Sequence, residues 1–238
     1  MATKPEHEVT ALVVDSDERV GGGGFLMIRR LRLRNRRADG STSAPYVSDS
    51  IARPYGQDAV VVAVYARDAA ARGGARVLVR DGLRPAIALG RDAAAAPLPE
   101  PPPALVLTEL VAGIVEVGDR GEAGLRARAA HEVDEEAGFT VAPERVALLG
   151  AGMLPSPGSM VEKFYFAAVE VDPAQQRALA GDGSPMEEGA TTRWLALGDA
   201  LDACVRGDIS DLKTELGLRR LADALAAEAA RPAAPAAS

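Results

Sequence analysis

The segment from residue 105 to residue 138 constrains the fold of this chain more than any other. The apolar run "LVLTELVAG", residues 105–113, has the composition of a buried strand that ends at Gly113. A helix from about Glu122 to Ala137 follows, and Gly138 supplies the left-handed residue that ends it. A strand, a loop and a helix in this order need a larger sheet to pack against, which predicts an α/β protein.

Three glutamates share one face of the predicted helix. At about 100° per residue, Glu132, Glu135 and Glu136 fall within one sector of ~100°, whereas Asp134 points the other way. Like charges one turn apart repel each other, so the arrangement does not stabilise the helix itself. Most charge runs are solvated helix faces, and Arg128 one turn earlier would compensate part of the repulsion. The alternative is a divalent cation held by carboxylate oxygens.

Further apolar runs predict the rest of an α/β sandwich with a mixed sheet. Strands are expected at residues 58–66, 75–81, 146–153, 163–171 and 191–197, and helices at 198–205 and 210–229. The proline-rich stretch 91–104 is expected to be a surface loop without strand or helix, because proline lacks an amide donor and fixes φ.

A small β unit is predicted before this sandwich. Two runs, Val9 to Val14 and Phe25 to Leu33, read as strands separated by the glycines 21–24 and followed by a loop. A short strand pair is marginal alone and needs another surface, so a homodimer that packs or exchanges these units is expected. The predicted organisation is a β unit at 1–57 for dimerisation and substrate binding, a main domain at 58–230, and a disordered tail at 231–238.

Composition limits the classes of partner. The net charge is −7 and the sequence pI is about 5.0, so a phosphate backbone would be repelled, and only residues 29–37 are locally basic. No nucleic-acid partner is expected. Because no stretch reads as a signal peptide or a bilayer span, a cytoplasmic protein without a membrane partner is expected. The single cysteine, Cys204, rules out an internal disulfide and is expected in a helix core.

The segment "AGIVEVGDRGEAGLRARAAHEVDEEAGF", residues 112–139, resembles the Nudix box. Compared with the family pattern, four residues are inserted between the glycine and the helix, and His131 stands where the family has arginine. The family's first glutamate falls on Ala123, for which Glu122 or Asp119 would stand in. The matching positions are Gly113, Glu132, Val133, Glu135, Glu136, Gly138 and Phe139.

The resemblance extends to three segments outside the box, most similar to ADP-ribose and UDP-sugar pyrophosphatases. In "VRDGLRPA", residues 79–86, Arg84 matches an arginine that contacts a substrate phosphate. The segment "SPGSMVEKFYFAAVEV", residues 156–171, is similar to a Ser-Pro-Gly turn and the strand after it. The segment "MEEGATTRWLAL", residues 186–197, resembles the loop that supplies a late glutamate, a place that Glu188 fits best and Glu187 next.

This resemblance implies a Nudix-type α/β/α sandwich with a mixed sheet, preceded by the small N-terminal β unit. It implies Mg²⁺, or Mn²⁺, held by Glu132, Glu135, Glu136 and the carbonyl oxygen of Ala112. Glu188 or Glu187 would help to activate a water molecule, Glu135 would complete the cluster, and Arg84 would hold a phosphate. The implied reaction is hydrolysis of a nucleoside diphosphate sugar to a nucleoside monophosphate and a sugar phosphate. ADP-ribose is preferred as substrate, because of the Ser-Pro-Gly segment, with UDP-glucose next.

Several alternatives stay open from the sequence. Arg84 reads equally as a surface arginine, and Glu187 and Glu188 equally as a solvated loop. The lengthened box and His131 suggest a catalytically silent domain that senses a nucleotide sugar, and a hydrolase of another nucleoside diphosphate derivative is a further possibility. Either His131 braces the glutamates in place of the family's arginine, or Arg128 has taken over that role.

Overall fold

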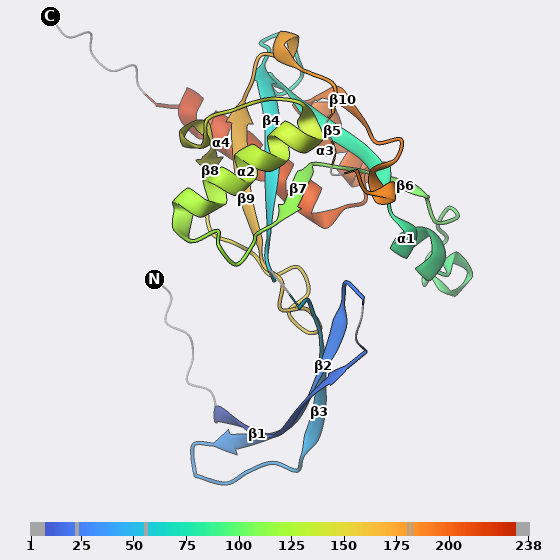
Figure 1. Ribbon diagram of the computed structural model, residues 1–238, viewed down its shortest axis with the longest axis vertical. Coiled ribbons are helices and arrows are strands. Elements are labelled where there is room, and N and C mark those ends of the chain that lie inside the picture. Colours follow the sequence, from blue (N-terminus) through green and yellow to red (C-terminus); the bar gives the residue numbers. More distant parts are fainter. Residues whose placement is uncertain (1–7, 22–23, 55–56, 180, 182, 232–238) are drawn as a thin grey trace, which may run out of the picture. The chain divides into compact units, whose positions relative to one another are not determined.

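The computed structural model describes residues 8–21, 24–54, 57–179, 181 and 183–231 (Figure 1). The chain forms two compact units, residues 1–57 with 154–163, and residues 58–153 with 164–238. Apart from Arg231, the predicted tail lies outside the described residues, as do two of the four glycines at 21–24. The separate roles predicted for the two parts of the chain stay predictions.

The first unit is a three-stranded antiparallel sheet in the order β1-β2-β3, made of β1 (Val9–Val20), β2 (Met27–Arg37) and β3 (Tyr46–Ala52). The sequence predicted the first two strands, although shorter, and missed β3. The segment 154–163 joins this unit because the amide of Ile51 donates a hydrogen bond of 2.7 Å to the carbonyl oxygen of Ser159. A stretch far along the chain therefore completes the N-terminal unit.

The basic run on β2 is matched by acids on its two neighbouring strands. Paired guanidinium and carboxylate groups fit each other as two parallel hydrogen bonds, which gives these cross-strand pairs a defined geometry. The pairs are Arg29 with Asp17 at 2.6 Å, Arg30 with Asp49 at 2.7 Å, and Arg34 with Asp15 at 2.6 Å.

The second unit contains a mixed sheet in the order β10-β5-β4-β9-β8. Only β4 and β9 run parallel, and the other neighbours are antiparallel. Residues 60–64 of β4 are buried without interruption, as expected for a strand with both faces of its sheet covered. The strands are β4 (Ala59–Arg67), β5 (Ala75–Leu83), β8 (Ala147–Leu148), β9 (Phe164–Glu170) and β10 (Thr191–Ala196).

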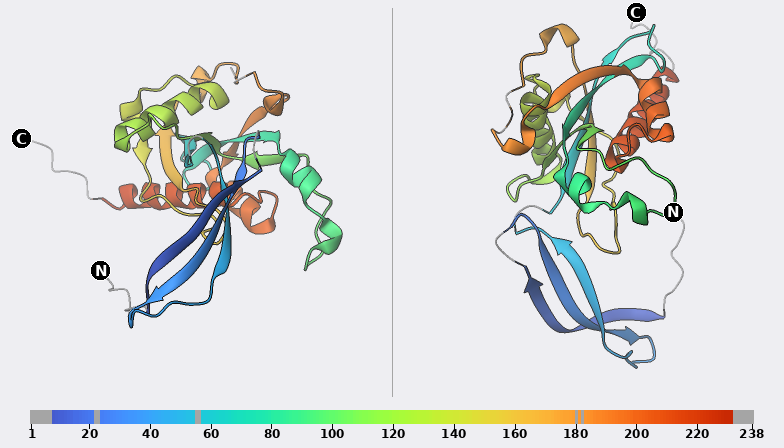
Figure 2. Two further views of the ribbon diagram at one scale, coloured as in Figure 1. Left: turned by 60° about the horizontal axis from the view of Figure 1, so that its bottom comes forward. Right: turned by 90° about the vertical axis from the view of Figure 1, so that its right-hand side faces the viewer.

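Helices cover the two faces of this sheet. Helix α2 (Gly121–Ala137) lies on one face, and α3 (Leu197–Arg206) and α4 (Leu212–Ala229) lie on the other (Figure 2). Alternate residues of β4 divide accordingly, since Val60 and Val62 belong to the core under α2 whereas Val61 belongs to the core under α3 and α4. The predicted α/β/α sandwich with a mixed sheet, preceded by a small N-terminal β unit, is confirmed. Cys204 is buried in α3, as expected.

The strand predicted at 105–113 is in fact two strands. The first, β6 (Val106–Glu109), pairs with β5, and the second, β7 (Val111–Ile114), pairs with β4. Between them Leu110 is buried, and its amide donates a hydrogen bond of 2.8 Å to the hydroxyl of Thr214 instead of joining a ladder. This switch from one partner strand to another carries Gly113 to the end of α2.

Other departures from the sequence prediction are local. A short helix, α1 (Pro85–Gly90), was not predicted, and the strand predicted at 146–153 is reduced to β8 because the chain turns at Gly150, whose φ is +77°. The expectation of no helix in 91–104 is wrong for one 3₁₀ turn, η1 (Ala93–Ala95). The remaining 3₁₀ turns are η2 (Pro143–Arg145), η3 (Pro173–Gln175) and η4 (Pro185–Glu187). Every helix in the described part of the chain is too short or too polar to span a bilayer.

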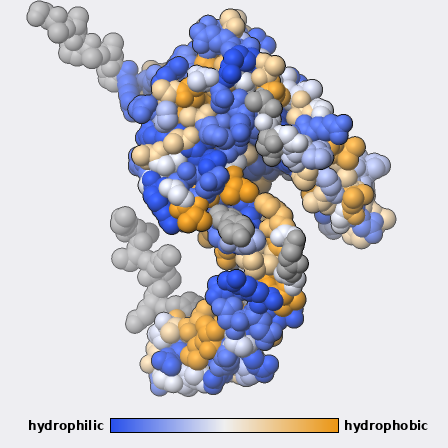
Figure 3. All heavy atoms as spheres, in the orientation of Figure 1, coloured by the Kyte–Doolittle hydropathy of each residue, from blue (hydrophilic) through white to orange (hydrophobic). Residues whose placement is uncertain are grey.

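Apolar side chains remain exposed on one face of the first unit, and Figure 3 shows apolar patches there among hydrophilic residues. Val14 lies opposite Leu33, and Leu33 lies opposite Tyr46, so the three share this face, on which Leu33 itself is buried between its neighbours. Two residues before Val14, Leu12 lies on the same face, and these two side chains are 58% and 56% exposed. An uncovered apolar face of this kind is typical of an interaction surface.

We predict that the protein sediments as a dimer at micromolar concentration and that the double substitution Leu12→Glu with Val14→Glu shifts it to monomer. Charged side chains on this face would have to be desolvated in the interface. A matched control is Leu89→Glu in α1, because Leu89 is 89% exposed and belongs to the second unit. A monomeric wild-type protein in the same experiment would contradict the prediction.

Candidate functional site

The acidic face predicted for residues 132–136 lies on the last turns of α2. The helix ends at Gly138, which adopts the left-handed conformation at φ +75° as predicted. Glu132 is buried, Glu135 and Glu136 are partly buried, and Asp134 points away to contact Arg177 and Thr140. The carboxylates therefore divide as the helical periodicity indicated.

Strand β7 and the end of α2 meet at Gly113. A Cβ atom at this position would overlap the carboxylate of Glu132, so the carboxylate occupies space that only a residue without a side chain leaves open. One residue earlier, the amide of Ala112 donates a hydrogen bond of 3.1 Å to Glu136. The carboxylates of Glu132 and Glu136 on α2 thus both contact the short strand β7.

Burial perturbs both of these carboxylates. It raises the pKa of Glu132 to about 7, and the nearby charge of Glu136 adds to this effect while Arg128 opposes it. Burial also raises the pKa of Glu136, against the opposing charge of Arg80. A divalent cation bound to these oxygens would remove the penalty for ionisation. The donor set therefore fits a hard cation such as Mg²⁺, which prefers carboxylate and carbonyl oxygen.

Arg128 organises the loop that leads into α2. Its guanidinium lies 3.7 Å from the carboxylate of Glu132, 2.8 Å from that of Asp119 and 2.9 Å from that of Glu116. Of the two acids that the sequence offered as substitutes, Asp119 contacts Arg128, whereas Glu122 is exposed and pairs with Arg126. The loop before α2 is held to the helix by Arg128 through Asp119 and Glu116.

His131 contacts a different glutamate. Its Nδ1 lies 3.2 Å from Glu135, and its side chain is 56% exposed. Both candidates for bracing the cluster thus contact one of its members, Arg128 contacting Glu132 and His131 contacting Glu135. Which of the two contacts orders the site stays a prediction to be tested.

Arg80 is a site residue that the sequence reasoning missed. Its side chain on β5 is 7% exposed, Nη1 lies 3.4 Å from Glu136, and Nη2 lies 2.8 Å from Glu187. Its Nε is buried without a hydrogen-bond partner among the described residues. The available signal was an arginine directly after the apolar run 77–79 of a predicted strand, where a buried cationic side chain needs acidic partners.

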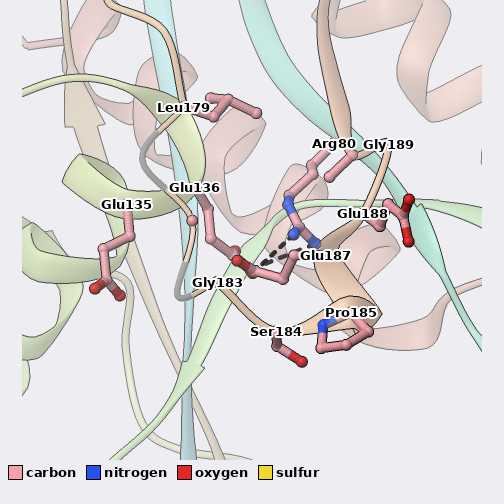
Figure 4. A pocket seen from close by; sticks show the side chains of 12 residues that line it. Arg80, Glu135, Glu136, Leu179, Gly183, Ser184, Pro185, Glu187, Glu188 and Gly189 are labelled. Atoms are coloured by element: carbon pink, nitrogen blue, oxygen red, sulfur yellow. Dashed lines mark hydrogen bonds and ion pairs between the residues drawn. The ribbon is translucent and has the colours of Figure 1, made fainter.

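A cleft of about 490 Å³ opens beside these residues. The carboxylate of Glu187, in η4, is held by Arg80 next to Glu136, whereas the side chain of Glu188 points away from Glu136 (Figure 4). The sequence favoured Glu188 as the late glutamate, with Glu187 next, and which of the two takes this role stays a prediction. The acidic and basic residues of the lining are Arg80, Glu135, Glu136, Glu187 and Glu188.

Arg84, predicted to hold a substrate phosphate, lies at the start of α1 and forms an ion pair with Glu109. Lys213 of α4 lies 2.6 Å from the same buried carboxylate. Glu109 is thus shared by two basic side chains. The predicted contacts of Arg84 with phosphate, and of the Ala112 carbonyl oxygen with a metal, stay predictions.

Comparison with known proteins locates the fold. No protein-family model and no curated protein sequence matches this chain. Among solved structures, the crystal structure of an ADP compounds hydrolase is similar over 94% of this chain and 98% of that chain, with a TM-score of 0.65 and 12% sequence identity. The two chains share a fold. At this level of identity the likeness establishes the architecture and leaves the activity to be argued from the site.

The perturbed pKa of Glu132 predicts a pH-dependent effect on stability. Between its ordinary pKa of 4.5 and about 7, the folded protein keeps a proton that the unfolded chain has released, so the contribution of this carboxyl group to stability falls as pH rises through that range. In metal-free buffer, Glu132→Gln should therefore raise the melting temperature at pH 8, by an amount equivalent to about 2 kcal/mol, and change it little at pH 4.5.

A matched control for this measurement is Asp134→Asn on the same helix. The hydrogen bond from Thr140 and the charge of Arg177 hold the pKa of Asp134 below its usual value, so its removal should lower the melting temperature at pH 8. An equal effect of Glu132→Gln at both pH values would contradict the assignment of a buried, ionisable carboxyl group.

Proposed function

We propose that this protein hydrolyses the pyrophosphate bond of a nucleoside diphosphate sugar with the help of a divalent cation, releasing a nucleoside monophosphate and a sugar phosphate. ADP-ribose is the preferred substrate and UDP-glucose the next. The observation that carries the proposal is the packing of Glu132 into the space at Gly113 with Glu136 on the Ala112 amide. The shared fold with an ADP compounds hydrolase supports the substrate class.

Glu132, Glu135, Glu136 and the carbonyl oxygen of Ala112 would hold Mg²⁺, with Mn²⁺ as a substitute. When bound, the cation neutralises charge that builds on the pyrophosphate oxygens and makes a water molecule easier to deprotonate. Arg128 holds Glu132 toward the strand, so the carboxylate has a fixed orientation before substrate arrives.

In this proposal Glu187 accepts the proton of the attacking water. Its carboxylate lies in the cleft, and the ion pair with Arg80 keeps it close to Glu136 without requiring the loop itself to be rigid. A positioned carboxylate within reach of the water is what general-base catalysis needs. Glu188 lies on the same loop and is the alternative base.

In this proposal Arg84 binds a phosphate of the substrate. Moving an arginine away from a buried acid is costly when the acid is left unpaired. Here Lys213 also pairs with Glu109, at 2.6 Å, so Arg84 can turn from Glu109 to a phosphate while Glu109 remains paired with Lys213. The shared acid thus supports the predicted role of this arginine.

The proposal is tested by incubating the protein with Mg²⁺ and ADP-ribose, UDP-glucose, GDP-mannose or NADH, and by measuring the monophosphate released. Release should be fastest from ADP-ribose. Glu136→Gln should lower turnover at least about 100-fold, because it removes negative charge from the cation site. Asp134→Asn, which alters the opposite side of the same helix, should retain activity.

Two outcomes would overturn parts of this proposal. Near-normal turnover by Glu136→Gln at moderate Mg²⁺ concentration would remove the metal-site assignment. Tight binding of ADP-ribose in calorimetry, without any turnover under the same conditions, would favour the catalytically silent sensor instead.

The two candidate bases are separated by comparing Glu187→Gln with Glu188→Gln. Glutamine keeps a hydrogen-bond acceptor for Arg80 but cannot take a proton, so Glu187→Gln should lower kcat by about 100-fold and flatten the acidic limb of the pH–rate profile. Glu188→Gln should leave both close to wild type. The reverse pattern would assign the role to Glu188.

A further inference from the structure

An imidazole stands at the outer edge of the acidic cluster. Ligand atoms of His131, Glu132 and Glu135 all lie within 4.8 Å of one another, and theirs is the one group of three such side chains found in the part of the chain that the structure describes. Glu132 is buried, Glu135 is half-buried and His131 is exposed, so the group runs from the core of the site to solvent. The cluster is therefore a mixed nitrogen and oxygen donor set rather than a purely acidic one.

Helix geometry makes His131 and Glu135 a chelating pair. Residues four apart on a helix lie one turn apart on the same face, and here Nδ1 of His131 is 3.2 Å from a carboxylate oxygen of Glu135. The same spacing on one helix is how two histidines bind zinc in the His-Glu-x-x-His arrangement. Glu132, adjacent in sequence, offers a third ligand from the buried side.

This donor set does not match the preference of Mg²⁺. Magnesium takes oxygen ligands and keeps several waters, whereas imidazole nitrogen suits transition metals, for which the affinity of a nitrogen and oxygen site rises from Mn²⁺ to Cu²⁺ and falls again at Zn²⁺. One histidine and two carboxylates leave a coordination position open, as in zinc sites that use three protein ligands. The three side chains together thus favour a transition-metal dication over Mg²⁺.

We propose that His131, Glu132 and Glu135 form a binding site for a transition-metal dication, with Zn²⁺ or Co²⁺ preferred to Mg²⁺ and the imidazole of His131 as a ligand. The inference rests on the proposed function, because it names a second cation position that shares Glu132 and Glu135 with the proposed magnesium centre. Glu136, held by Arg80 and by the Ala112 amide, belongs to the inner position alone.

Arginine at position 131 would behave differently from histidine. A guanidinium carries a permanent positive charge and has no lone pair to donate, so it can form an ion pair with Glu135 but cannot coordinate a metal. A neutral imidazole carries no charge but has a nitrogen lone pair that can coordinate a metal. His131→Arg therefore separates the two roles, since arginine can pair with Glu135 but cannot coordinate a metal.

The test uses metal alone on the purified full-length protein. Co²⁺ is titrated while its visible absorption is followed, and the Mn²⁺-loaded protein is examined for nitrogen modulation in the electron spin echo. The chain has two histidines, so any imidazole signal comes from His131 or from His7. His7→Gln is the matched control, and His131→Gln and His131→Arg are the test variants. Because His131 is 56% exposed, both variants should fold normally, which circular dichroism checks.

We expect nitrogen modulation in the wild type and in His7→Gln, and none in His131→Gln or His131→Arg. Both His131 variants should bind Co²⁺ at least about 10-fold more weakly, with Mg²⁺ affinity nearly unchanged for His131→Gln. Absence of nitrogen modulation in the wild type, or equal Co²⁺ affinity in His131→Gln, would overturn the inference.

Failure of this inference is distinguishable from failure of the proposed function. Hydrolysis of ADP-ribose with Mg²⁺ but no nitrogen signal would reject the mixed site and leave the hydrolase standing. A nitrogen signal that depends on His131, in a protein that hydrolyses none of the four substrates, would keep the metal site and reject the hydrolase.

Discussion

The contact between the Glu132 carboxylate and Gly113 is the constraint on which the site depends. It requires a residue without a side chain at the end of β7 and a helix whose last turns point a carboxylate at that strand. The switch of the chain at Leu110, from the ladder with β5 to the ladder with β4, delivers the glycine to that place. Burial of an ionisable group here costs stability when the group is charged.

Each glutamate of the cluster has its own basic partner, and this division explains how three acids tolerate one another on two turns of helix. The permanent charges of Arg128 and Arg80 offset repulsion that would otherwise destabilise the end of α2. A cation bound at the proposed site would have to compete with these contacts. The pairs are Arg128 with Glu132, His131 with Glu135, and Arg80 with Glu136.

The two units of the chain are stabilised by different kinds of interaction. The second unit has two apolar layers, one on either face of its sheet, and needs no further surface for its core. The first is a single sheet whose strands are joined by cross-strand ion pairs and many of whose apolar side chains remain exposed, although Leu33 is buried. A sheet of this kind gains stability from whatever covers it.

The sequence by itself determined the elements whose signal is local. Helix α2, its end at Gly138, and the shared face of three glutamates follow from periodicity and from the left-handed conformation that glycine adopts. Strands β4, β5, β9 and β10 follow from runs of apolar residues, and these elements suffice for the fold class.

Tertiary structure decided whatever depends on a distant partner. The break at Leu110 requires the hydroxyl of Thr214, which lies 104 residues further along the chain. The burial of Arg80 depends on its acidic partners, Glu136 on α2 and Glu187 in η4. In the sequence alone, these partners are not visible, and β5 shows only a charged residue next to apolar ones. The proposal of Glu187 over its neighbour as the base likewise rests on the contact of Glu187 with that arginine. Local propensity reports what a segment can form, but a buried charge or a diverted amide is satisfied only by groups that folding brings to it.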